Sequence, residues 1–150
     1  MKIAVGADHA GFELKQQLVK EIEAAGHEVV DLGAHHYDAL DDYPDFAEKV
    51  GLAVARKEVD RGVLVCGSGV GASIAANKIK GVRAGVSMDT YSAHQGVEHD
   101  DVNVLVLGSR IIGPALASEV LASFLEAEFS GEERHVRRLN KVLQIEERGK

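Results

Sequence analysis

Short apolar runs alternate with longer segments of helical periodicity along the chain of 150 residues. The apolar runs are rich in Val, Ile, Leu and Ala and occupy residues 2–6, 28–32, 62–66, 82–86 and 103–107. The segments with helical periodicity occupy residues 10–25, 44–58, 70–79, 90–98, 114–128 and 132–146. Strands that alternate with helices form parallel sheets with helices on both faces, and a chain of this length fits one domain. We therefore predict an α/β fold, a single-domain, Rossmann-like three-layer αβα sandwich around a five-stranded parallel sheet.

The composition excludes several classes of protein. No apolar run approaches the ~20 residues that cross a bilayer, and the apolar start of the chain is too short for a signal peptide. Cys66 is the only cysteine, so no internal disulfide can form, which is typical of a reducing compartment. The net charge of −7 argues against a nucleic-acid partner, which would favour a basic face. We expect a soluble, cytoplasmic protein with no membrane and no nucleic-acid partner.

A glycine-rich turn follows the apolar run at residues 62–66 and leads directly into a segment of helical pattern. Gly67, Gly69 and Gly71 allow positive φ and bring backbone N–H groups toward a ligand, while the next helix directs its positive dipole end to the same place. The turn is therefore predicted to hold a phosphate or an oxyanion. It lacks the Gly-Lys-Ser/Thr ending of a Walker loop, and the first strand is not followed by the dinucleotide-binding glycines.

Cys66 stands at the beginning of this turn. Backbone amides and a helix N-terminus stabilise a thiolate, which is both a nucleophile and a proton acceptor. A lone cysteine is also commonly a buried, inert side chain, and both interpretations stay open at this point. A Cys–His–acid hydrolase would need a histidine within hydrogen-bond reach of Cys66, and a thiol redox protein would need a second, resolving cysteine, which the chain lacks.

Polar residues follow the apolar strands. Asp8 and His9 come after the first strand, Met88 and Asp89 after the fourth, and Arg110 shortly after the fifth. Ligands of open parallel sheets bind beyond the carboxyl ends of the strands, so we expect these residues to gather at one sheet edge around the glycine-rich turn. Asp8 equally fits the role of a helix cap.

A histidine and a group of cations lie further along the chain. His99 is predicted at the C-terminal end of a helix, where the dipole favours the protonated imidazole, an acid; a surface histidine among carboxylates fits as well. Arg134 and Arg138 are four residues apart on one side of a predicted helix and can clamp a phosphate. Arg137 and Lys141 are expected on a solvated face.

The histidine pattern does not indicate a metal site. His35 and His36 are adjacent in a predicted loop, and His94 and His99 are five residues apart, which places them on different sides of a helix. We expect no metal and no other cofactor.

A series of short motifs occurs in order along the chain: GADHAG at residues 6–11, DYP at 42–44, VCGSGVG at 65–71, IAANK at 74–78, YSA at 91–93, His99, NVL at 103–105 and GSR at 108–110, followed by Arg134 and Arg138. In this order and spacing the chain resembles the type B ribose-5-phosphate isomerases, which are related to the subunits of galactose-6-phosphate isomerase. The resemblance extends over essentially the whole length.

The resemblance implies an aldose–ketose isomerase that acts without a metal on an open-chain sugar phosphate, with D-ribose 5-phosphate and D-ribulose 5-phosphate as the favoured pair. Cys66 matches the base that takes the proton from C2, and His99 matches the residue that opens the furanose ring. Family members are homodimers or dimers of dimers with shared active sites, which we expect here. The substrate-binding positions that the resemblance implies are Asp8, His9, Gly67, Ser68, Gly69, Val70, Gly71, Asp100, Arg110, Arg134 and Arg138.

Two positions depart from the family pattern. Ser68 stands where threonine is usual and keeps the hydroxyl. Asp100 stands where asparagine is common, and its negative charge beside a phosphorylated substrate is unfavourable unless it is paired or turned toward His99. Ala72 occupies the place of the glutamate that serves as base in some members, which leaves Cys66 as the candidate base. The alternatives are a six-carbon substrate, such as allose or galactose 6-phosphate, and a non-catalytic sugar-phosphate sensor on the same fold.

Overall fold

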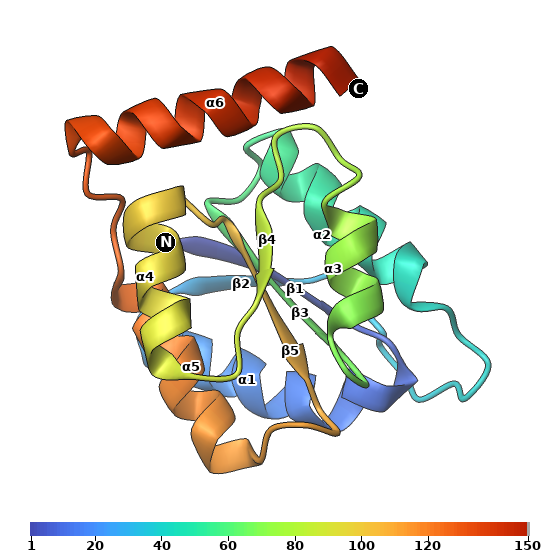
Figure 1. Ribbon diagram of the computed structural model, residues 1–150. Helices are drawn as coiled ribbons and strands as arrows, with labels where there is room; N and C mark the ends of the chain where they lie inside the picture. Colours follow the sequence, from blue (N-terminus) through green and yellow to red (C-terminus); the bar gives the residue numbers. More distant parts are fainter. Residues whose placement is uncertain (150) are drawn as a thin grey trace.

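The computed structural model describes residues 1–149, which form one parallel sheet between two layers of helices (Figure 1). The strands are β1 (Lys2–Ala7), β2 (Glu28–Asp31), β3 (Arg61–Cys66), β4 (Ala84–Val86) and β5 (Val104–Gly108), in the order β2-β1-β3-β5-β4. The helices are α1 (Phe12–Ala24), α2 (Tyr43–Ala55), α3 (Val70–Ala76), α4 (Thr90–Asp100), α5 (Pro114–Glu126) and α6 (Glu133–Gly149), with a 3-10 turn, η1, at His9–Gly11. The predicted α/β sandwich is confirmed.

Alternate residues of the central strands face opposite helical layers, because successive side chains of a strand point to opposite faces. Val63 and Val65 of β3 pack into the core that α1, α4 and α5 cover. Leu64 and Cys66 pack into the core that α2 and α3 cover. Both faces of the sheet are covered, which explains why the central strands β1, β3 and β5 are apolar except for Lys2 and Arg61 at the start of β1 and β3. Cys66 therefore directs its side chain toward α2 and α3.

The parallel register brings the carboxyl ends of three strands together. Val65 of β3 pairs with Ala7 of β1, and Cys66 pairs with Gly108 of β5. After β1 the chain adds β2 next to one edge of β1, and it then returns to add β3 next to the other edge. The strand order therefore reverses between β1 and β3. Ligands bind at such a switch point in open parallel sheets. The topology thus places Cys66 where a ligand crevice is expected.

Two glycines allow backbone segments to approach one another at this edge. A Cβ atom at Gly11 would lie 2.3 Å from the carbonyl oxygen of Val65, and one at Gly108 would lie 2.5 Å from the carbonyl oxygen of Ser68. No side chain fits at these distances. The segment after β1 is therefore in direct contact with β3, and the segment after β3 is in direct contact with the end of β5.

Several helix boundaries differ from the prediction by one to three residues, and side-chain hydrogen bonds explain two of the differences. The helix expected from residue 10 begins as a 3-10 turn, because the Asp8 side chain accepts a hydrogen bond from the N–H of Gly11 at 3.1 Å. The helix expected to reach residue 79 ends at Ala76. There the side chain of Asn77 donates to the carbonyl of Ala84 at 2.9 Å and accepts from its N–H at 2.8 Å, which ties the end of α3 to β4.

The last helix, α6, lies across the end of the molecule opposite to the glycine-rich turn (Figure 1). It contacts the C-terminal end of α4 and has one buried residue, His135. Val142 and Leu143 of α6 line a pocket of about 400 Å³ together with Val82 and Val102. None of the helices in residues 1–149 combines the length and the apolar character that a membrane span requires.

We predict that Gly11→Ala destabilises the fold, because the new methyl group must displace backbone atoms of β3. The free energy of unfolding should fall by about 1–3 kcal/mol or more, as for other overpacked sites. Urea denaturation measures this change. Gly85→Ala is the matched control, since its Cβ atom would meet Val102 at an ordinary 3.7 Å. Equal urea midpoints for the parent and Gly11→Ala would contradict the close approach.

Candidate functional site

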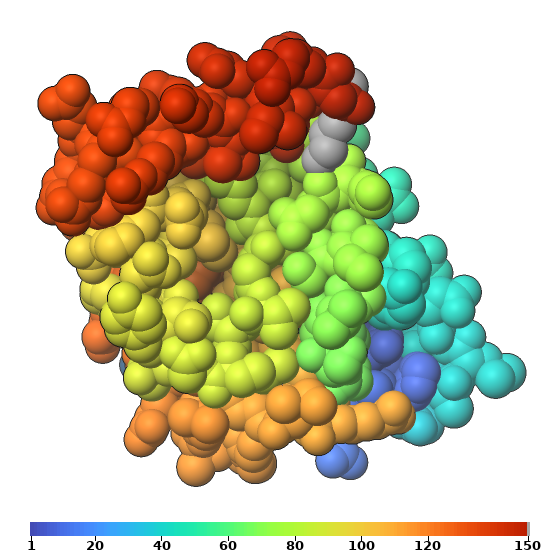
Figure 2. All heavy atoms as spheres, viewed as in Figure 1, coloured from blue at the N-terminus to red at the C-terminus, as the bar shows by residue number. Residues whose placement is uncertain are grey.

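Several of the expected site residues gather at the carboxyl edge of the sheet. Asp8 and His9 follow β1, Cys66 ends β3 and precedes the glycine-rich turn, and Arg110 follows β5. Figure 2 shows atoms of the first strand region, the loop before α2, the glycine-rich turn and the segment near residue 110 meeting at the lower right of the molecule. The predicted gathering at one edge is therefore observed for these residues. Asp89 caps α4, where its side chain accepts from the N–H of Ser92 at 2.6 Å.

Cys66 lies against the first turn of α3. Its Sγ atom accepts a hydrogen bond from the N–H of Gly69 at 3.2 Å, and the residue is 5% exposed. Gly69 has φ of +85°, a left-handed conformation that favours glycine. The N–H of Val70 donates to Oγ of Ser68 at 3.2 Å. An N–H donor aimed at the sulfur stabilises a thiolate, which is the form that can accept a proton.

The glycine-rich turn is held by the chain after β5. The carbonyl of Cys66 accepts from the N–H of Ser109 at 2.8 Å, and the carbonyl of Gly67 accepts from the N–H of Arg110 at 3.0 Å. Ser109 also donates from Oγ to the carbonyl of Ala10 at 2.6 Å. A Cβ atom at Gly67 would lie 3.4 Å from Nη1 of Arg110. The Arg110 guanidinium therefore lies across the turn and adds a positive charge to it.

His9 is fixed by Asp41, a residue of the loop before α2. Oδ1 of Asp41 accepts from the backbone N–H of His9 at 2.9 Å and lies 2.7 Å from Nδ1 of its ring. This side-chain hydrogen bond raises the pKa of His9, and the charge of Asp8 acts in the same direction against the opposing effect of burial. The hydrogen bond to Asp41 thus favours the protonated form of His9 at the sheet edge. Sequence reasoning missed Asp41, because it lies in a loop with no periodic pattern.

A buried lysine anchors the beginning of that loop. Lys15 is 2% exposed, and its Nζ donates to both carboxylate oxygens of Asp31 at 2.8 Å and to the carbonyl of Ala34 at 2.7 Å. Asp31 also accepts from the N–H of Gly33 at 2.9 Å. A buried charge is stable only when it is paired and hydrogen-bonded in this way. The anchored loop start limits where Asp41 can lie.

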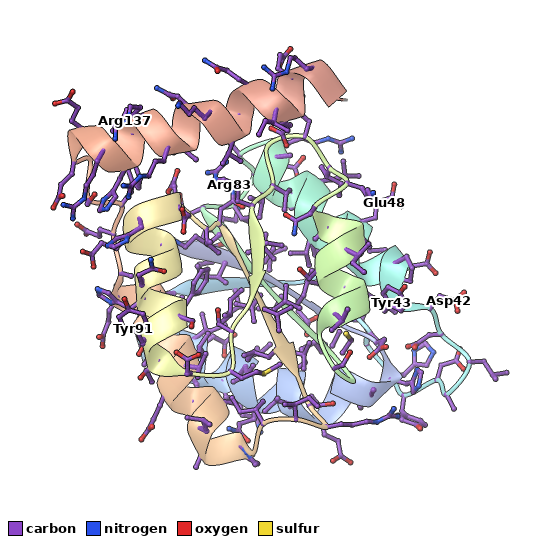
Figure 3. All side chains as sticks on the ribbon, in the orientation of Figure 1. Asp42, Tyr43, Glu48, Arg83, Tyr91 and Arg137 are labelled. Carbon is purple, nitrogen blue, oxygen red and sulfur yellow. The ribbon has the colours of Figure 1, made fainter. Side chains whose placement is uncertain are left out.

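The ring of Tyr43 packs directly on the glycine-rich turn. A Cβ atom at Gly71 would lie 2.6 Å from this ring, so the contact requires glycine at that position. Figure 3 places Tyr43 at the beginning of α2, beside α3. Tyr43 belongs to the DYP motif, but no spacing in the sequence places it in the site.

One group of residues in the described chain could offer three ligands to a metal. The ligand atoms of Asp8, His9 and Asp41 lie within 4.8 Å of one another. A metal binds the neutral imidazole, whereas the raised pKa of His9 favours its protonated form. Oδ1 of Asp41 already binds both the backbone N–H and the ring Nδ1 of His9, so two of the three groups are engaged with each other.

His99, Arg134 and Arg138 lie at the opposite end of the molecule. His99 is near the end of α4, which precedes β5, and the first residue of β5 pairs with Gly62 at the beginning of β3. Cys66 lies four residues further along β3, which corresponds to about 13 Å at the usual rise of a strand. Within one chain, His99 and the two arginines therefore do not meet Cys66.

Asp100 is exposed at the end of α4 and lines the pocket beneath α6 with Asn77 and Arg83. The hydrogen bonds and ion pairs of His99 involve Gln95, 3.0 Å from Nδ1, and Glu98, 3.8 Å from Nε2. Glu98, rather than Asp100, is thus the carboxylate beside the His99 ring in the described residues.

Comparison with known proteins agrees with this arrangement. The model of the Ribose/Galactose Isomerase family matches residues 3–142. Ribose-5-phosphate isomerase B of Escherichia coli is 46% identical over 147 residues, 98% of this chain and 97% of that protein. This chain belongs to the ribose/galactose isomerase family. The resemblance stated from the sequence is confirmed.

Solved structures of ribose/galactose isomerases share the whole fold. Ribose-5-phosphate isomerase B of Clostridium thermocellum is 44% identical, with a TM-score of 0.96 and full coverage of both chains. The Mycoplasma genitalium enzyme with bound ribulose-5-phosphate is 39% identical, with a TM-score of 0.93 over 97% of this chain and 96% of that chain. A relative from Mycolicibacterium smegmatis, 37% identical over 97% of both chains, is a D-erythrulose-4-phosphate isomerase. Membership of the family therefore leaves the length of the sugar open.

We predict that Asp41→Asn in this ribose/galactose isomerase lowers the pKa of His9 toward the ordinary value of about 6.5. In the parent the ion pair is fully present below that pH and is lost as the pH rises through the raised pKa of His9. NMR titration of the His9 ring protons measures the midpoint. Asp42→Asn, at the adjacent exposed position, should leave the midpoint unchanged. The same midpoint in the parent and Asp41→Asn would contradict the assignment.

Proposed function

We propose that this protein interconverts D-ribose 5-phosphate and D-ribulose 5-phosphate through an enediolate, with Cys66 as the base. The observation that carries the proposal is the position of Cys66 at the carboxyl end of β3, with the N–H of Gly69 donating to its sulfur. The relatives named as ribose-5-phosphate isomerases support the reaction.

In this mechanism the Cys66 thiolate takes the proton from C2 of the open-chain aldose and returns it to C1, while the hydroxyl proton of O2 moves to O1. Negative charge develops on the substrate oxygen between these steps. The backbone of residues 67–71 and the beginning of α3 would stabilise that charge with fixed N–H dipoles. Tyr43 covers the turn at Gly71, which limits the access of water to the reacting atoms.

Four basic side chains are assigned to the substrate, and the phosphate is bound at a distance from the reacting atoms by Arg134 and Arg138. His9, held in its charged form by Asp41, and Arg110 belong to the Cys66 end of the molecule. Arg134 and Arg138 belong to the α6 end. Binding energy from the remote phosphate orients C1 and C2 against the base. Asp8 and Ser68 are assigned to the substrate hydroxyl groups.

We infer that the site is completed by a second copy of the chain, in a homodimer or a dimer of dimers. In one chain the arginines and His99 lie at the end opposite to Cys66, so a partner would supply His99, Asp100, Arg134 and Arg138. Exposed apolar side chains near the edge strand β4 support an interface between copies. They are Val70 and Ile74 on α3, Val86 on β4 and Tyr91 on α4. Figure 3 labels Tyr91 on α4.

A four-carbon substrate is the second candidate, because a relative that covers almost all of this chain is a D-erythrulose-4-phosphate isomerase. Six-carbon sugar phosphates stay an alternative, as the name of the family indicates. A sensor without catalysis would need the arginines but not Cys66 beside the glycine-rich turn.

The cytoplasmic location stays a prediction from the single cysteine.

Isomerisation assays with ribose 5-phosphate, D-erythrulose 4-phosphate and allose 6-phosphate, without added metal, test the function. We predict that the parent converts ribose 5-phosphate fastest and that Cys66→Ala lowers kcat by about 100-fold or more, as expected for loss of a general base. Phosphate binding by Cys66→Ala should persist. Full activity of Cys66→Ala would refute the assigned base, and no turnover of any sugar by the parent would favour the sensor.

A further inference from the structure

A stacked pair of histidines lies where α4 meets the beginning of α6. The rings of His99 and His135 are face to face, with centroids 4.0 Å apart and planes 26° apart. His135 is 1% exposed and is the buried residue of α6. His99 is assigned to the opening of the furanose ring, whereas His135 has no role in the proposed reaction.

The hydrogen bonds of His135 define its protonation state. Its Nε2 lies 3.2 Å from the Nε–H of Arg134, and Nε2 must accept because a guanidinium has donors only. The ring proton therefore sits on Nδ1, which donates to Oγ of Ser130. This hydroxyl oxygen also accepts from the N–H of Glu132 at 3.2 Å. With one nitrogen accepting and the other donating, His135 is a neutral imidazole.

The surroundings of His135 favour the same state. Burial lowers the pKa of His135, and the neighbouring positive charges of His99, Arg134 and Arg138 lower it further, against the weaker opposing effect of Glu132. Two imidazolium rings in contact would repel each other. A neutral His135 ring avoids this repulsion in the stacked pair.

The other groups around His99 come from α4. Gln95 donates to Nδ1 of His99 at 3.0 Å, and its amide can present its oxygen instead when that nitrogen is protonated. Glu98 lies 3.8 Å from Nε2 of His99 and forms an ion pair with His94 at 3.0 Å. The N–H of Ser130 donates to the carbonyl of Glu98 at 3.0 Å, so the residues that hold His135 are themselves attached to α4.

We propose that His135 is a positioning residue, whose neutral ring is a fixed platform that holds the His99 imidazole in the orientation needed for ring opening. The inference rests on the proposed function, in which His99 opens the furanose. In that step the C1–O4 bond breaks and O4 takes the Nε2 proton of the His99 imidazolium. The O1 hydroxyl proton leaves to solvent water as C1 becomes a carbonyl, and water reprotonates His99.

The test separates ring opening from enolisation. Ribulose 5-phosphate has no furanose form, because its O5 carries the phosphate, so uptake of deuterium at C1 from D₂O needs the base but no ring opening. We compare this uptake with the isomerisation of ribose 5-phosphate in the parent, His135→Ala, which removes the stack, and His135→Phe, which keeps a flat ring but loses both ring hydrogen bonds. Gln144→Ala, at an exposed position of α6, is the control.

We expect His135→Ala to lower kcat for ribose 5-phosphate by about 10- to 100-fold while deuterium uptake stays within about 3-fold of the parent. His135→Phe should fall between the parent and His135→Ala, and Gln144→Ala should match the parent. An equal loss of both reactions would assign His135 a merely structural role, and no loss of either would also overturn the proposal.

NMR of the unliganded protein gives a readout that does not depend on the reaction. The ring current of His135 should displace the His99 Cε1–H signal in the parent and in part in His135→Phe, and the displacement should vanish in His135→Ala. An unchanged His99 signal in His135→Ala would overturn the proposal. A parent that catalyses neither reaction would instead refute the proposed function, and the NMR spectra would still decide whether His135 holds the His99 ring.

Discussion

The parallel pairing of β3 with β5 determines where the chemistry of this protein can lie. Cys66 pairs with Gly108 at one end of these strands, and Gly62 pairs with Val104 at the other. The first pair brings the glycine-rich turn and Arg110 together. The second pair keeps the end of α4, with His99, at the opposite end of the same strands. A helix that returns against parallel strands must end where the next strand begins, so no change of side-chain rotamer can unite these two groups in one chain.

Charge explains how an acidic chain can take an anionic substrate. The net charge of −7 would repel a sugar phosphate, but the field near a binding site depends on the nearest groups. His9 and Arg110 lie at the Cys66 edge, and Arg134 and Arg138 lie at the beginning of α6. Asp41 orients the His9 ring at this edge, and its hydrogen bond raises the pKa of His9.

The strands, the order of helices and the glycine-rich turn could be predicted because they depend on local patterns. Apolar runs and turn glycines are visible in the sequence, and the parallel topology follows from the alternation of strands and helices. Asp41, Tyr43 and His135 could not be assigned in this way. Their roles depend on which residues a loop or a distant helix brings against His9, Gly71 and His99, and no spacing within one element encodes those contacts.

Subunit complementation tests most directly whether two copies share the site. Cys66→Ala and His99→Asn should each be nearly inactive as pure proteins. After the two are unfolded together and refolded in equal amounts, half of the dimers should be mixed, and one of their two sites combines an intact Cys66 with an intact His99. The account predicts recovery of about a quarter of the parent's activity. No recovery in a mixture shown to contain hybrid dimers would contradict the shared site.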